Sequence, residues 1–196
     1  MNIVKKWAGV LLLLAVCAGC RGRSESEGEA EKYLEKLNDN QAIIHASIAG
    51  KPFYGAENVF SGQIIMSGDV MNLTLTDQFD GRTIINAAGD KWYAQRPVSV
   101  QIDRDGESGS SLKMGKIVDR EKLIGEGYMM TKGEIKAIVF EKDKMVFELK
   151  GEVAKYSDFE KPDQYLPFEA LVVYKKPAIS FGDMSEQAIF GSTYSK

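Results

Sequence analysis

The spacing of the hydrophobic positions changes from a helical period to a two-residue period near residue 41. Beyond that point apolar residues alternate with polar ones, as in Val98, Val100 and Ile102, whose intervening residues are polar. One apolar and one polar face per segment is typical of antiparallel sheets with one solvated side. Segments of this kind lie at 42–48, 63–66, 71–75, 82–88, 91–95, 98–102, 127–131, 134–141, 145–153 and 168–174. Short turn sequences separate them, Lys132-Gly133 among them, so we predict a mostly β fold: an antiparallel β-sandwich or a partly closed β-barrel of roughly ten short strands.

A helical pattern precedes the strands. Tyr33, Leu34 and Leu37 recur at spacings of one helical turn, which predicts a short N-terminal helix within residues 29–40. Ser26 and Glu29 have the spacing of a capping box at its start. A helix of this length is marginal in isolation, so we expect it to dock on the β-rich region.

The N-terminus has a third pattern, an unbroken apolar run from Ala8 to Val16. Two cationic residues, Lys5 and Lys6, come before the run, and small residues lead from it to Cys20. This three-part layout is typical of a secretory signal. The 13 residues from Trp7 to Gly19 are too few for a membrane-spanning helix, which needs about 20.

The end of this run, Cys17-Ala18-Gly19-Cys20, resembles the lipobox of bacterial lipoproteins. The last three positions fit the family pattern, and Cys17 departs from the usual aliphatic residue. The resemblance implies that residues 1–19 are a signal peptide, that the sulfur of Cys20 carries a diacylglycerol and its amino group a further chain such as palmitate, and that the lipid bilayer holds the protein through this residue. The alternatives are an ordinary secretory signal that happens to end in cysteine and a buried apolar segment.

Arg21, and not aspartate, follows the cysteine. By analogy with enteric bacteria, this indicates the outer membrane, at its periplasmic face or at the cell surface. Residues 21–29 contain no large apolar side chain, which predicts a solvated tether. We therefore expect a signal peptide at 1–19, the lipidated cysteine and tether at 20–28, a short helix at 29–40 and a single β-rich globular domain at 41–196.

Composition narrows the function classes. Removing 19 residues from the 196 leaves 177, and the loss of Lys5 and Lys6 leaves 23 basic against 28 acidic side chains, a net charge of −5. A mildly acidic chain argues against a nucleic-acid partner. With Cys17 removed and Cys20 acylated, the mature chain has no free thiol and no disulfide, which excludes cysteine nucleophiles and cysteine-type zinc sites.

Candidate catalytic and metal-binding residues are few. His45 is the single histidine, and alternation with Ile44 and Ala46 places it on the polar side of its strand, as a surface or rim residue. There is no Gly-x-Ser-x-Gly motif for a serine nucleophile. The run from Asp103 to Gly106 begins like a calcium loop but lacks the later ligands of an EF-hand, which leaves a looser calcium site or a solvated turn. The run from Asp77 to Gly81 predicts a hairpin turn.

Aromatic residues leave two interpretations open. Trp92 and Tyr93 are adjacent on a predicted strand and therefore point to opposite faces, while Phe53 and Tyr54 follow the first strand. They fill the core or, where exposed, stack on a ligand.

These observations predict a membrane-anchored lipoprotein of the cell envelope that is no enzyme and has no catalytic residue, metal or cofactor. Its function would be that of a binding or assembly module for an envelope protein or another ligand. The first alternative is a lipocalin-like carrier of a small apolar ligand, with an internal cavity lined by Met71, Leu73, Val100 and Phe147. The second is a carboxylate-dependent hydrolase of envelope glycans, which requires two acids facing each other across a cleft.

Overall fold

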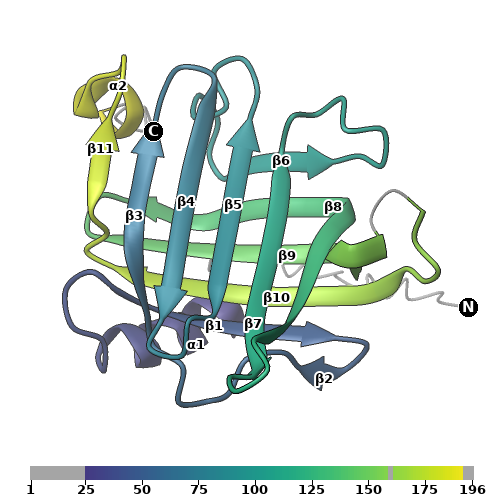
Figure 1. Ribbon diagram of the computed structural model, residues 1–196. Helices are drawn as coiled ribbons and strands as arrows, with labels where there is room; N and C mark the ends of the chain where they lie inside the picture. Colours follow the sequence, from purple (N-terminus) through teal and green to yellow (C-terminus); the bar gives the residue numbers. More distant parts are fainter. Residues whose placement is uncertain (1–24, 159–160, 192–196) are drawn as a thin grey trace, which may run out of the picture.

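Eight antiparallel strands close into a β-barrel in the computed structural model, which describes residues 25–158 and 161–191 (Figure 1). The strands pair in the order β3-β4-β5-β7-β8-β9-β10-β1, and β1 returns to β3. Their bounds are β1 (Gln41–Ile48), β3 (Phe60–Met66), β4 (Val70–Asp77), β5 (Arg82–Ala88), β7 (Ser111–Asp119), β8 (Ile124–Glu141), β9 (Lys144–Lys155) and β10 (Leu166–Lys175). The predicted mostly β fold is confirmed, and the barrel is closed.

Shorter elements decorate this barrel. Strand β2 (Lys51–Pro52) pairs with β1, β6 (Val98–Ile102) pairs with β8, and β11 (Ile179–Phe181) runs parallel to β3. The helices are α1 (Glu25–Leu34), the single turn η1 (Tyr156–Asp158) and α2 (Glu186–Phe190).

The barrel closes at a seam between β1 and β3, through the pairs Gln41–Ser61 and Ala42–Phe60. Tyr174, a fully buried residue of β10, lies across the seam. Its hydroxyl is 2.6 Å from Asn40 Oδ1 and 2.8 Å from the carbonyl oxygen of Gly62 on β3. Burial raises the pKa of Tyr174 to about 12. The side chain thus joins both edges of the sheet at the point of closure.

The connections between strands lie at two ends of the barrel. The hairpin end carries the tip of the β7–β8 hairpin, the β4–β5 turn and residues 49–59 (Figure 1). The opposite end carries the β3–β4 turn, residues 89–97, residues 103–110 and the β8–β9 turn. These two names are kept below.

Strand β8 corrects one predicted turn. It runs unbroken for 18 residues through Lys132-Gly133, where the sequence predicts a turn between two strands. The register against β9 shifts here, as in a β-bulge. Gly133 lies opposite Gly151 and has a φ of 156°, and a Cβ on Gly133 would lie 2.3 Å from the carbonyl oxygen of Lys150. The glycines therefore permit a close approach inside a bent strand.

The segment 91–95, predicted as a strand, is a turn instead. Lys91 has a φ of 49°, and the amide of Ala94 donates a hydrogen bond to its carbonyl oxygen. Trp92 folds inward as a buried residue, and its Nε1 donates to the carbonyl oxygen of Ser67 at 2.9 Å. The indole therefore covers the opposite end of the barrel. The apolar residues of this segment predict a strand, but Trp92 fills the core from a turn.

The N-terminal helix is displaced from its predicted position. Helix α1 spans Glu25–Leu34, and a hydrogen-bonded turn continues it to Leu37, so residues 25–28 belong to the helix and not to a tether. Ser26 lies within the helix, and the predicted capping box is wrong. Ala30 and Leu37 are buried with Val146 and Val173 on the outer face of the sheet. This docking holds the helix on the sheet, as expected for a helix too short to be stable alone.

Candidate functional site

The barrel interior is filled by its own side chains. Met71, Leu73 and Phe147, three of the residues expected to line a cavity, are at most 1% exposed and belong to one contiguous cluster of buried residues. Val100, the fourth, is partly buried and packs against the same cluster from β6. An eight-stranded barrel has an interior just wide enough for side chains. At these positions the expected ligand cavity is replaced by packed core.

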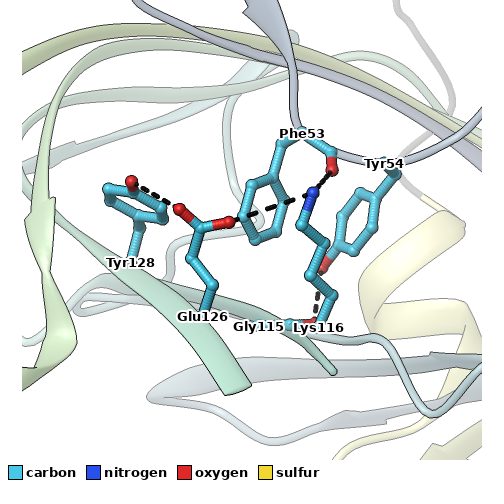
Figure 2. Close-up of polar contacts among 6 residues, drawn as sticks. All are labelled: Phe53, Tyr54, Gly115, Lys116, Glu126 and Tyr128. Carbon is cyan, nitrogen blue, oxygen red and sulfur yellow. Dashed lines mark hydrogen bonds and ion pairs between the residues drawn. The ribbon is translucent and has the colours of Figure 1, made fainter. Parts of the chain in front are cut away.

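A polar cluster closes the hairpin end of the interior (Figure 2). The ammonium of Lys116, on β7, donates to the carbonyl oxygen of Phe53 and lies 4.6 Å from the centroid of the Phe53 ring. It is also 4.0 Å from a carboxylate oxygen of Glu126, on β8, whose other oxygen accepts a hydrogen bond of 3.0 Å from the hydroxyl of Tyr128. Burial, and secondarily the hydrogen bond to Glu126, raises the pKa of Tyr128. Each polar group is thus held by a neighbour.

Tyr54 completes this closure. Its hydroxyl is 2.8 Å from Thr83 Oγ1, 3.0 Å from the carbonyl oxygen of Arg82 and 3.4 Å from that of Gly115. Burial raises its pKa far above the ordinary tyrosine value. Within the described residues, every fully buried side-chain nitrogen or oxygen has a hydrogen-bond partner. Of the two interpretations of Phe53 and Tyr54, core filling and ligand stacking, the structure therefore supports core filling, at the mouth of the barrel.

The residues singled out for chemistry lie apart from one another. His45 is exposed on the outer face of β1, as predicted, with its ring centroid 4.6 Å from that of Tyr33 on α1. Asp105 accepts a hydrogen bond from the amide of Glu107, and the amide of Gly106 donates to the carbonyl oxygen of Asp103, as in an ordinary turn. The described part of the chain holds no cluster of three or more histidine, cysteine and acidic residues suited to a metal ion.

The predicted hairpin turn at residues 77–81 is confirmed. Asp77 is buried, and its Oδ1 accepts hydrogen bonds from the amides of Phe79 at 2.8 Å and Gly81 at 2.6 Å. The side-chain amide of Asn58 donates to its other oxygen. The carboxylate organises the β4–β5 turn, which accounts for its burial without a catalytic role. Cys20 lies outside the described residues.

The largest hollow near these elements is a trough on the outside of the barrel, across β5, β7 and β8. Its floor is made of glycines: Gly115 of β7 lies opposite Gly127 of β8, and Gly125 lies opposite Ile117. The trough encloses about 1020 Å³ open to solvent. Glycines in strands mark places where a ligand or another backbone approaches closely.

The walls of the trough carry an excess of cations and an exposed aromatic ring; the two acids that line it, Asp80 and Glu126, are paired with Arg120 and Lys116. Arg82, Lys113 and Lys155 line it, and none of the three forms an ion pair with a carboxylate among the described residues. Tyr156, which is 58% exposed, stands beside Gly127, and the ammonium of Lys113 is 6.0 Å from its ring centroid. The trough therefore offers unpaired positive charge and one accessible aromatic face.

Sequence reasoning did not find this site because β7 was missed. The signal that could have found it is the alternation of Lys113, Gly115 and Ile117, which repeats in Gly125, Gly127 and Met129. Because successive side chains of a strand point to opposite faces, these residues place glycines and a cation on one face of the strand pair. Leu112, Met114 and Met130 then lie on the other face.

Comparison with known proteins leaves the site to be interpreted from its own geometry. The chain matches no family model, no curated protein and no solved structure. No helix in the described residues is long and apolar enough to cross a membrane.

Proposed function

We propose that the protein is a non-enzymatic binding module of the cell envelope, held in place by a lipid on Cys20, and that the outer trough is its binding surface. The observation that carries this proposal is the gathering of three unpaired cations and an exposed tyrosine over a glycine floor. The packed barrel serves as the scaffold that fixes their positions.

The trough chemistry favours an anionic ligand with one flat or apolar face. Arg82, Lys113 and Lys155 supply positive charge, which stands out because the mature chain would carry a net charge of −5. The ring of Tyr156 offers a stacking surface, and the glycine floor lets a flat group approach the backbone. An acidic sugar, or an acidic segment of an envelope protein, has this chemistry.

Ligand binding to the purified lipoprotein in detergent tests the proposal. We expect a panel of acidic saccharides and acidic peptides to include a binder whose affinity falls as salt rises, because screening weakens exposed charge interactions. Lys113→Gln and Tyr156→Ala should each weaken binding. The matched control is Lys91→Gln, which removes an exposed cation at the opposite end. Equal effects of Lys113→Gln and Lys91→Gln would contradict the assignment of the trough.

The closed barrel also keeps a lipocalin-like carrier as a second candidate, because eight-stranded barrels of this kind can hold one small ligand. Cargo inside would have to displace the packed side chains around Phe147. Native mass spectrometry of the lipoprotein purified gently from cells separates the two functions. Added mass that disappears on denaturation and survives Lys113→Gln would favour the carrier, and a bare mass favours the trough.

A further inference from the structure

The outer face of the barrel carries a row of hydrogen-bonded polar side chains beside the trough. Asn72 of β4 lies opposite Asn86 of β5, which lies opposite Ser111 of β7. The side-chain amide of Asn72 donates to Oδ1 of Asn86, and that of Asn86 donates to Oγ of Ser111 at 2.9 Å. The hydroxyl of Thr74 donates to Oδ1 of Asn72 at 3.2 Å. These four residues are called the polar ladder below.

The polar ladder begins where the trough ends. Ile84 and Lys113, which line the trough, lie opposite each other, and Asn86 and Ser111 are the next outward pair along the same two strands. Arg82 precedes Asn86 by four residues on β5, a span of roughly 13 Å at about 3.3 Å per residue. Strands β4, β5 and β7 lie side by side (Figure 1), so the trough and the ladder form one continuous surface.

This surface carries positive charge and no outward acid. Among the outward residues of the described strands β3, β4 and β5, and of β7 as far as Ile117, the charged side chains are Arg82 and Lys113, both cations. Asp77, the one acid within these stretches, is buried. An anionic ligand that extends from the trough over the ladder is therefore attracted and meets no carboxylate on the way.

The outward face of the β8–β9 pair is different. Glu134 lies opposite Lys150 there, and Lys136 lies opposite Glu148, so charges of both signs face each other and offset one another. The outward face of β4, β5 and β7 instead carries amide and hydroxyl groups that hold one another in a fixed orientation. The polar ladder is thus unlike the solvated face of mixed charge that the same barrel builds elsewhere.

The polar ladder keeps hydrogen-bonding groups for a ligand. A side-chain amide has two N–H groups, and Asn72 and Asn86 each use one of them within the ladder. The hydroxyl of Ser111 accepts from Asn86, which leaves its own O–H to donate. All four residues of the ladder are partly exposed. Fixed, neighbouring donors of this kind suit the hydroxyl groups of a sugar, which both donate and accept.

An extended peptide finds less to bind on this surface. Peptides that bind to sheets add a strand at a free edge, but β4 and β5 are each paired on both sides. A saccharide needs no backbone edge, because its hydroxyls hydrogen-bond to side chains and its ring packs on an aromatic face such as that of Tyr156. The surface therefore favours a sugar over a peptide.

We infer that the trough and the polar ladder together bind an acidic oligosaccharide, whose anionic groups lie at Arg82, Lys113 and Lys155 and whose neighbouring hydroxyls lie on the ladder. This inference rests on the proposed function of the trough and names its ligand class. The span of roughly 13 Å from Arg82 to Asn86 exceeds one sugar ring, so the ligand has several units.

Calorimetric titration of the purified lipoprotein in detergent tests this inference. The probes are oligosaccharides that carry uronate, sialate, sulfate or phosphate groups, neutral oligosaccharides of the same length, and acidic peptides. We expect an acidic oligosaccharide to bind, and its neutral counterpart and the peptides to bind about tenfold more weakly or not at all, since each lacks one of the two sets of contacts.

Variants of the ladder separate its contribution from that of the cations. Asn86→Ala and Ser111→Ala should each weaken oligosaccharide binding about fivefold at every salt concentration, because they remove neutral hydrogen bonds. Lys113→Gln should instead flatten the salt dependence, because it removes a contact that salt screens. Gln101→Ala, which removes an exposed amide from β6, is the matched control and should bind like the wild type. Thermal unfolding checks each fold, and Ser111→Ala, which removes a single hydroxyl, keeps the test available if Asn86→Ala does not fold.

The outcomes distinguish failure of this inference from failure of the proposed function. If no acidic probe, saccharide or peptide, binds in a way that Lys113→Gln weakens, the proposed function of the trough fails and the inference fails with it. If acidic peptides bind through Lys113 and no acidic oligosaccharide does, the trough stands and the inference alone is overturned. Oligosaccharide binding that both Asn86→Ala and Ser111→Ala leave unchanged would also overturn it, because the ladder would then be only a solvated surface.

Discussion

The two faces of the β7–β8 pair differ in the size and the burial of their side chains. The inward face carries large side chains, such as Met114 and Met130, that are buried in the core. The outward face carries glycines at 115, 125 and 127, with cations and an exposed tyrosine around them. Since successive side chains of a strand point to opposite faces, one pair of strands can hold the core together and form a binding surface without conflict. The inward face should therefore govern stability, and the outward face should be free to change.

The largest expected effect is on the inward face of the barrel, at Phe147 of β9, the strand that pairs with β8. Phe147→Ala removes a side chain that is 1% exposed, and we expect the free energy of unfolding to fall by about 3–5 kcal/mol. Urea denaturation measures it, and Phe79→Ala, at an exposed position, is the control with an effect within about 0.5 kcal/mol. A nearly neutral Phe147→Ala would show that the interior is loosely filled, and would favour the carrier function.

Matched glycine substitutions sharpen the comparison. A Cβ on Gly151 would lie 2.1 Å from the carbonyl oxygen of Lys132, so Gly151→Ala should cost about 1–3 kcal/mol as the strands move apart. A Cβ on Gly125 meets nothing nearer than the carbonyl oxygen of Lys116 at 3.5 Å. Gly125→Ala should therefore leave stability unchanged or raise it by up to about 1 kcal/mol. Equal destabilisation by both, measured by thermal unfolding, would mean that the trough floor is part of the packed scaffold.

Below pH 10, Tyr174→Phe should lower the free energy of unfolding by about 1 kcal/mol, because it removes a buried hydroxyl from its hydrogen bonds. Above pH 10 this effect should depend on pH. The pKa of Tyr174 is about 12 in the folded protein, above the ordinary value of 10 for tyrosine. Between these pH values the unfolded chain loses a proton that the folded chain keeps, so stability falls as pH rises, by up to about 1.4 kcal/mol per pH unit. Below pH 10 this contribution is fully present.

Comparison of the wild type with Tyr174→Phe isolates this contribution, since Tyr54 is common to both proteins. The stability advantage of the wild type should be present at pH 9 and shrink by pH 11. A wild-type advantage that is constant across this range would contradict the raised pKa.

The parts of the fold that the sequence predicted are those with a clean two-residue period. Strand β6 was predicted with its observed bounds, 98–102, because polar and apolar residues alternate there without interruption. Strand β5 was also predicted with its observed bounds, 82–88, because turn sequences at Asp80-Gly81 and Gly89-Asp90 delimit it. Strand β7 was missed because Gly115 leaves its outward face without a side chain and Lys116 turns a charge toward the interior, where Phe53 and Glu126 hold it. Local alternation cannot reveal a lysine whose partners are 10 and 63 positions away.

Glycine was misread for a related reason. Lys132-Gly133 has the composition of a turn, but Gly133 faces Gly151 on the neighbouring strand, and this pairing lets a long strand bend. The candidate site depends on the same ambiguity, because Gly115 and Gly127 become a floor only once the register places them opposite each other. Barrel closure depends on the pairing of β1 with β3, and the trough floor depends on the register of the β7–β8 hairpin. The two-residue period of a single sequence specifies neither.

The smallest expected effect concerns the ion pair that connects the β7–β8 tip to the β4–β5 turn. The side chains of Arg120 and Asp80 are 59% and 65% exposed, so Arg120→Gln should lower the free energy of unfolding by at most about 0.5 kcal/mol. Lys142→Gln, which breaks an exposed pair with Glu186 at the opposite end, is the control and should have an effect of similar size. Urea denaturation of the two variants side by side makes the measurement. A clearly larger loss for Arg120→Gln would show that the projecting hairpin is held by its neighbour and not by its own backbone ladder, so that the outward face, too, would carry part of the stability.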